Sequence, residues 1–74
     1  MNDATLISET LAILDRTGLT DVQASAVIGC SPSTVKLIRV TGQAPKQRRA
    51  RESLVRFVEL NRGATDRTHL RFAA

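Results

Sequence analysis

The chain contains few of the residues from which catalytic and metal sites are usually built. Its 74 residues include one cysteine, Cys30, one histidine, His69, and no tyrosine or tryptophan. A single cysteine cannot form a disulfide within the chain, and it lies too far in sequence from the histidine to suggest a metal site. We therefore expect no metal and no cofactor. We also expect that the protein is not an enzyme, since catalysis needs several convergent polar groups in a pocket.

Aromatic residues and clustered glycines are also scarce. The aromatic side chains are limited to two phenylalanines, Phe57 and Phe72. Proteins that bind RNA or single-stranded DNA usually stack bases on aromatic rings, so this composition counts against that class. The four glycines stand singly along the chain, so we expect no glycine-rich loop that holds a nucleotide's phosphates.

Long apolar runs are missing. Residues 1–18 have no basic leader, and Ser8, Glu9 and Thr10 interrupt their apolar positions. This segment is expected to be neither a signal peptide nor a membrane span, which predicts a cytoplasmic protein that binds no membrane. No feature of the sequence points to a small-molecule ligand.

The short length limits the stability that one subunit can reach. The 74 residues are enough for one domain. A chain of this size buries only about 60% of the surface that its unfolded form exposes, so its stability is marginal unless something adds to it. Because we expect neither a disulfide nor a metal, we predict a homodimer on energetic grounds.

The stretch from Thr20 to Thr41 carries the most specific signals. Thr20 and Gln23 have the spacing of a capping box, which starts a helix. Gly29 suits a sharp turn, because a residue without a Cβ tolerates backbone angles that others avoid. Ser31 can cap a second helix, with a proline following at its first position. The pattern predicts two short helices joined by a tight turn, a helix-turn-helix.

Apolar spacing supports this prediction. Ala24 and Ile28 share one face of the first helix, and Val35 and Ile38 share one face of the second. Cys30, in the turn, is expected to fill the angle between them as a small apolar side chain, although a redox role at a helix start is the alternative.

These residues resemble the helix-turn-helix of the phage Cro and repressor family, also called XRE. The similarity rests on a small residue, Ser25, four before Gly29, on the Ser-x-Ser-Thr-Val segment that begins at Ser31, and on Ile38. Family members usually have alanine in place of Ser25 and a loop glycine one residue earlier than Gly42. Where relatives place Gln, Asn or Arg to read bases, this chain has Pro32, Ser33 and Leu37, so the operator sequence is not predicted.

The resemblance implies an all-α, lambda-repressor-like domain of four helices over residues 1–63, with the motif at about 20–41. It also implies a sequence-specific transcriptional regulator, in particular a homodimeric repressor that binds double-stranded DNA at an inverted repeat. Such proteins commonly regulate phage or mobile-element genes.

Charge is distributed unevenly along the chain. The net charge is +4, but the part before Lys36 has one basic and four acidic residues, whereas Lys36 to Arg51 has six basic residues and no acidic one. A solvated basic loop is the simpler interpretation, but next to a helix-turn-helix this run favours nucleic acid. If about six phosphates were neutralised per subunit, the logarithm of the DNA-binding constant K would fall with the logarithm of the salt concentration at a slope of about −5.

The expected contacts with DNA divide into two sets. The outward side chains of the second motif helix are predicted to face base edges: Ser33, Thr34, Lys36, Leu37 and Val40. The hydroxyl, amide and basic groups around that helix are predicted to contact phosphates: Ser31, Arg39, Gln43, Lys46, Arg48, Arg49 and Arg51.

Two further helices and a tail complete the prediction. The first helix is expected to begin with Asp3 or Thr5 as its cap and to end near Thr17, and the last helix is expected at about residues 46–61. Residues 64–74 are expected to form a tail whose alternating pattern suggests a short strand, and which contacts a second subunit, folds back on the core, stays disordered or forms a fifth helix. The predicted dimer contacts are the surplus apolar residues of the last helix and the tail: Val55, Val58, Leu60, Leu70 and Phe72.

A protein-interaction module is the alternative function. Such a module would keep the helix-turn-helix shape and bind a regulator or polymerase, as an antiactivator does. Leu37 and Val40 favour it, because both are apolar and occupy the expected reading face.

Overall fold

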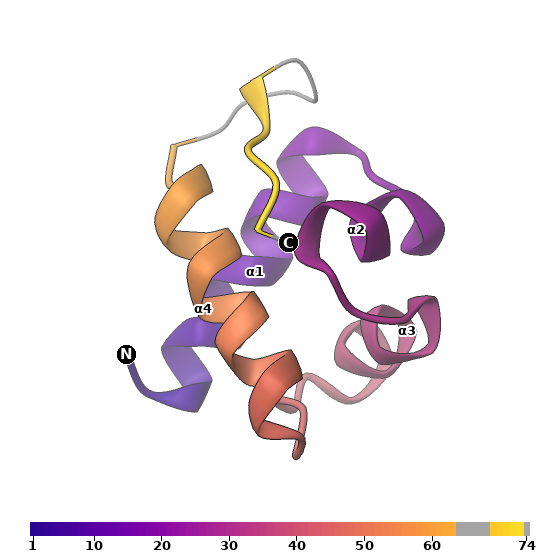
Figure 1. Cartoon of the computed structure of the whole chain (residues 1–74), viewed down its shortest axis with the longest axis vertical. Coiled ribbons are helices and arrows are strands. Elements are labelled where there is room, and N and C mark those ends of the chain that lie inside the picture. The colour runs from indigo at the N-terminus through magenta and orange to yellow at the C-terminus, as the bar shows by residue number, and fades with distance from the viewer. Residues whose placement is uncertain (64–68, 74) are drawn as a thin grey trace.

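The computed structural model describes residues 1–63 and 69–73, and these residues form four helices and no strand. The helices are α1 (Asp3–Thr17), α2 (Asp21–Ile28), α3 (Pro32–Thr41) and α4 (Arg48–Asn61). Helix α4 packs along α1, and α2 packs against both α3 and α4 (Figure 1). None of these helices has the length and apolar character that crossing a bilayer requires. The predicted all-α class is confirmed for the described part of the chain.

The cap of helix α1 lies one residue before Asp3, the earlier of the two predicted caps. The side chain of Asn2 accepts a hydrogen bond of 2.8 Å from the backbone N–H of Thr5, so Asn2 is the cap rather than Asp3 or Thr5. Asparagine suits this position because its short amide can reach the free N–H groups of the first turn. The predicted end is confirmed: Gly18 has a φ of 67°, a left-handed conformation that a residue without a Cβ adopts readily.

The two motif helices have the predicted ends. The Thr20 hydroxyl accepts from the N–H of Gln23 at 3.2 Å, and the Gln23 side chain accepts from the N–H of Thr20 at 3.1 Å. Gly29 ends α2 with a φ of 88°, and Ser31 caps α3. The short connection leaves α3 packed across α2 with its buried residues, Val35 and Ile38, facing the core.

One apolar core unites the four helices. It is centred on side chains that are fully or almost fully buried: Leu6, Ile13, Leu14, Ala24, Ile28, Val35, Ile38, Leu54, Phe57 and Val58. Two buried threonines of α1, Thr10 and Thr17, are compatible with this core because each hydroxyl donates to a carbonyl one turn earlier, at 2.7 Å. Cys30 packs against the core from the turn, as expected.

Helix α4 differs from the prediction in one respect that concerns function. It begins at Arg48, so the loop before it is longer than expected and includes Lys46 and Gln47. Gln47 occupies the cap position, but its side chain makes no capping hydrogen bond. The side chains of these two residues therefore extend from a loop next to α3.

The described part of the tail, residues 69–73, folds back on the core. The N–H of Ala73 donates to the carbonyl of Val27 at 2.9 Å, and Ala73 is buried. The predicted strand at Leu70 and Phe72 is not formed, because the extended segment pairs with a helix end and a side chain rather than with another strand. Of the alternatives for the tail, folding back is observed for these residues, whereas positions 64–68 and 74 lie outside the described residues.

Candidate nucleic-acid interface

Helix α3 exposes one face to solvent. Val35 and Ile38 point into the core, and the helical period therefore turns Lys36, Leu37 and Val40 outward. Leu37 is 58% exposed and Val40 is 75% exposed, so two large apolar side chains of this face are open to solvent. Four of the five predicted base-contact residues lie on this exposed surface: Ser33, Lys36, Leu37 and Val40.

Thr34 and Ser31 form hydrogen bonds with each other at the start of α3. The Ser31 hydroxyl accepts from the backbone N–H of Thr34 at 3.2 Å, and the two hydroxyls lie 2.9 Å apart in a hydrogen bond. Thr34 is also half-buried. Only one of the two hydroxyls donates in this contact, so the base contact of Thr34 and the phosphate contact of Ser31 stay predictions. Ser33 has an exposed side chain and no such hydrogen bond among the described residues.

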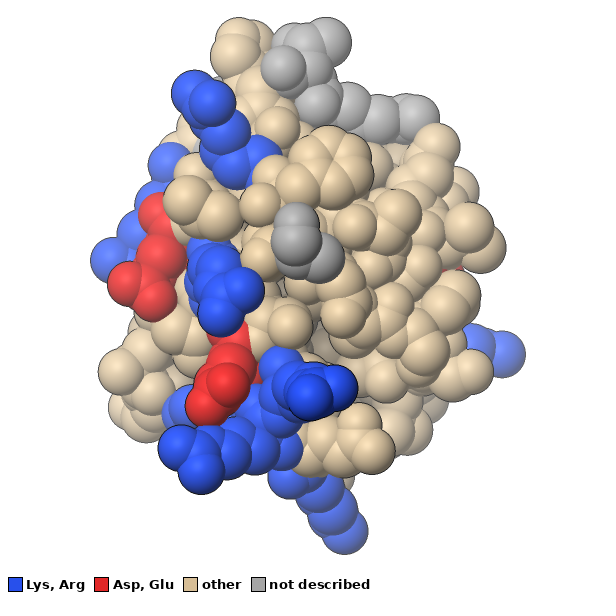
Figure 2. All heavy atoms as spheres, viewed as in Figure 1, with Lys and Arg blue, Asp and Glu red and all other residues tan. Residues whose placement is uncertain are grey.

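Positive charge gathers next to this face. Lys36, Lys46 and Arg49 are exposed, and among the described residues none of them forms an ion pair. In Figure 2, lysine and arginine side chains gather over the lower end of the molecule, where α4 begins. A surface hollow of about 210 Å³ brings Arg49 together with the start of α3, because both Arg49 and Ser31 line it. The helix dipole at the start of α3 and an adjacent guanidinium both favour an anion.

Three of the predicted phosphate ligands, Arg39, Arg48 and Arg51, form ion pairs within the molecule. The Arg39 guanidinium binds Asp21 at 2.7 Å and the Leu19 carbonyl at 2.6 Å. Arg51, near the start of α4, pairs with the first residue of α1, since its Nε lies 2.8 Å from a carboxylate oxygen of Asp3. Arg39 and Arg51 would therefore have to exchange these contacts for a phosphate, and their assignment as phosphate ligands stays a prediction.

Arg48 remains available. Its Nε lies 3.1 Å from Glu52 Oε1, but the Arg48 side chain is 92% exposed. Exposed ion pairs one helical turn apart contribute only about 0.3–0.5 kcal/mol, so a phosphate can replace the carboxylate. Arg48 is therefore retained as a predicted phosphate contact, together with Lys46 and Arg49.

A second hollow lies between the end of α3, the loop and the start of α4. It has a volume of about 360 Å³, and its lining includes Leu37, Gln43, Pro45, Lys46 and Gln47. The Gln43 side chain is exposed, as a phosphate or base contact requires. Gln47 lines both hollows and was missed by the sequence analysis. The expected start of α4 at residue 46 placed Gln47 inside a helix, and its position beside a basic run is the signal that points to it.

Cys30 has the surroundings of a structural cysteine. Burial raises the pKa of its thiol, so less thiolate is present near neutral pH than for a free cysteine. Among residues 1–63 and 69–73 there is no group of three histidine, cysteine or acidic side chains that could hold a metal ion.

The predicted dimer contacts divide into exposed and buried residues. Val58 is fully buried inside the subunit, so its assignment to an interface is wrong: it faces the core from α4. Val55 and Leu70 are partly buried and pack against that core. Leu60 and Phe72 remain exposed, Phe72 to 64%. Of the five predicted residues, Leu60 and Phe72 are therefore the main candidates for a contact between subunits.

Comparison with known proteins adds no relative. No protein family, no curated protein and no solved structure matches the chain.

Proposed function

We propose that the protein is a sequence-specific, double-stranded DNA-binding transcriptional regulator in which α2 and α3 act as a helix-turn-helix of the Cro and repressor kind. The observation that carries the proposal is the exposed face of α3, with Lys36 unpaired among the described residues and Lys46 and Arg49 beside it. The major groove of B-DNA admits an α-helix, and this face combines basic, hydroxyl and apolar groups that can each contact a base edge.

The exposed residues support a division of contacts. Lys36 reaches guanine O6 or N7, Ser33 can bond either donors or acceptors, and Leu37 and Val40 suit the C5-methyl group of thymine. Lys46, Arg48 and Arg49 hold phosphates, with Gln43 and Gln47 next to them. Three such cations per subunit correspond to a salt slope of about −3, smaller than the −5 expected when all six basic residues were counted.

The proposed protein acts as a homodimer and represses transcription by occupying a promoter. Two copies would place their α3 helices in successive major grooves about 34 Å apart, on an inverted repeat. The exposed Phe72 and Leu60 are the apolar side chains that a second subunit could cover. The proposal includes no catalytic activity, and it places the protein in the cytoplasm, where its DNA target is found.

A protein-interaction module is a second candidate, and a specific observation favours it. Leu37 and Val40 form an exposed apolar pair beside a hollow that Pro45 also lines. An amphipathic acidic segment of a regulator or polymerase would suit this surface and its basic surroundings. DNA binding is favoured because the basic residues Lys36, Lys46 and Arg49 lie next to a helix-turn-helix, a combination that suits a duplex.

A fluorescence titration separates the two candidates. Labelled duplexes from the region upstream of the protein's own gene are titrated with the protein, with and without excess unrelated DNA and over a range of salt concentrations. Nanomolar binding that survives the competitor supports the regulator. Micromolar binding that is equally strong for all duplexes and is abolished by modest salt favours the interaction module. The Lys36→Ala variant is titrated in parallel, and the regulator predicts that it binds more weakly and loses the preference at one base pair.

A further inference from the structure

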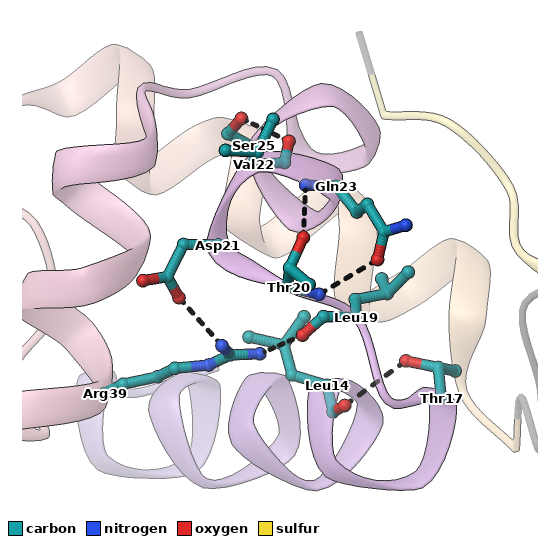
Figure 3. A network of polar contacts seen from close by, with 9 residues as sticks. All are labelled: Leu14, Thr17, Leu19, Thr20, Asp21, Val22, Gln23, Ser25 and Arg39. Carbon is teal, nitrogen blue, oxygen red and sulfur yellow. Dashed lines mark hydrogen bonds and ion pairs between the residues drawn. The ribbon is translucent and has the colours of Figure 1, made fainter.

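Arg39 lies on the proposed DNA-binding helix, but its guanidinium is directed toward the start of α2 and the turn before it. Its Nη1 lies 2.7 Å from Asp21 Oδ1, and its Nη2 donates to the Leu19 carbonyl at 2.6 Å (Figure 3). The Arg39 side chain is only 33% exposed. A basic residue that reaches for DNA would instead leave its donors in solvent.

The two acceptors lie on either side of the cap of α2. Leu19 belongs to the turn after α1 and is buried, whereas Asp21 is the first residue of α2. Between them, Thr20 caps α2 through the reciprocal hydrogen bonds with Gln23 (Figure 3). One guanidinium therefore connects α3 to the turn after α1 and to the start of α2.

This connection fixes an orientation that the apolar contacts leave less well defined. Val35 and Ile38 share one apolar core with Ala24 and Ile28 of α2, and apolar burial is non-directional. A two-pronged, charge-assisted contact is directional, because each N–H must point at its acceptor. Arg39 and Leu37 are two residues apart, about 200° around the helix, so the contact that holds Arg39 inward turns Leu37 outward.

We propose that Arg39 is a positioning residue, which sets the rotation of α3 through Asp21 and the Leu19 carbonyl, and is not a phosphate contact. The inference rests on the proposed DNA binding. It assigns the two basic residues of α3 opposite tasks: Lys36 meets the DNA, and Arg39 holds the helix that presents it.

Asp21→Asn gives a test in which the two roles predict effects of opposite sign. If Arg39 is a phosphate contact, removing the carboxylate releases Arg39 and removes a repelling charge, so DNA affinity rises. If Arg39 is a positioning residue, Asp21→Asn loosens α3, and affinity for the selected site falls by about 3–10-fold. Arg39→Ala should lower that affinity by about tenfold or more, with no change in the salt slope.

Two variants serve as controls. Arg49→Ala removes a cation that forms no ion pair with any described residue, and it should flatten the salt slope by about one unit. Arg39→Lys keeps the charge but cannot reach two acceptors with a fork, so a phosphate role predicts near wild-type binding and a positioning role predicts weakened binding. Circular dichroism at the assay temperature restricts the comparison to folded variants, and Arg39→Lys is the variant to use if Arg39→Ala does not fold.

The double variant completes the experiment. If Asp21 and Arg39 act through each other, Asp21→Asn combined with Arg39→Ala should be no weaker than Arg39→Ala alone. Tighter binding by Asp21→Asn, or a salt slope reduced by one unit in Arg39→Ala, overturns the positioning role and leaves the proposed function intact. Failure of the wild-type protein to bind any duplex specifically overturns both.

Discussion

The Asn61 side chain holds the backbone of Arg71 at two points. Its oxygen accepts from the Arg71 N–H at 2.6 Å, and its nitrogen donates to the Arg71 carbonyl at 2.8 Å. Asn61 is almost completely buried, and its nitrogen also donates to the Phe57 carbonyl at 2.9 Å. One buried amide at the end of α4 thus fastens the C-terminal segment to the helical core.

Asn61→Ala should therefore destabilise the protein. The substitution removes these three hydrogen bonds and leaves the polar backbone groups of Arg71 without their partner, which costs about 2–3 kcal/mol. Urea denaturation followed by circular dichroism measures the change. Arg56→Ala is the control, because it removes only one part-buried hydrogen bond, of 3.1 Å, from the same segment. Equal, small effects of the two substitutions would show that the Asn61 contact does not hold the tail.

Much of the helical framework could be predicted because its signals are local. Thr20 with Gln23, and Ser31 with the following proline, each define a helix start within a few residues, and Gly29 needs only its own backbone to end one. The role of Asn61 could not be predicted in this way, because its partner Arg71 is distant in sequence and is chosen by tertiary packing.

The candidate site was predictable only in part for the same reason. The helical period identified the outward positions of α3, including Lys36 and Leu37. It could not show that Arg39 and Arg51 face Asp21 and Asp3, since those partners come from other helices. The composition does not distinguish an arginine that is open to a ligand from one that forms an ion pair within the fold.

Lys36→Ala and Arg49→Ala should affect DNA binding differently. Lys36 is proposed to contact a base, so its removal should cost about 1–3 kcal/mol and relax the preference at one base pair. Arg49 is proposed to contact a phosphate, so its removal should weaken all sequences alike and flatten the salt slope by about one unit. Titrations of matched and single-mismatch duplexes at several salt concentrations measure both effects. Identical behaviour of the two variants would contradict the proposed division.

Leu37 should make binding sensitive to thymine methyl groups. An exposed apolar side chain in the major groove has the C5-methyl group of thymine as its apolar contact, so replacing thymine by uracil should weaken binding by about 1 kcal/mol per contacted methyl. The measurement compares a selected site with versions in which single thymines are replaced. Leu37→Ala is the control, because it should abolish the difference between thymine and uracil. A site that tolerates every replacement would exclude this contact.

Cys30 should lower the stability of the protein at high pH. Burial raises the pKa of its thiol in the folded state, so the folded protein holds this proton more tightly than the unfolded chain does. The stabilisation is fully present below the thiol's ordinary pKa of about 8.5, and it is lost as the pH rises through the higher pKa of the folded state. Urea denaturation between neutral pH and about pH 10 measures the loss, and Cys30→Ala should reduce it. An unchanged pH dependence in Cys30→Ala would show that the thiol does not contribute.

Selection of bound fragments from random double-stranded DNA tests the central claim most directly, because it asks whether α3 reads a sequence. Wild-type protein and the Lys36→Ala variant are selected in parallel. The account predicts that the wild-type protein enriches an inverted repeat whose half-sites lie about one helical turn apart, roughly 34 Å, and that the variant loses the preference at one position in each half-site. The absence of any enriched motif, or the same motif with the same preferences in both selections, would contradict it.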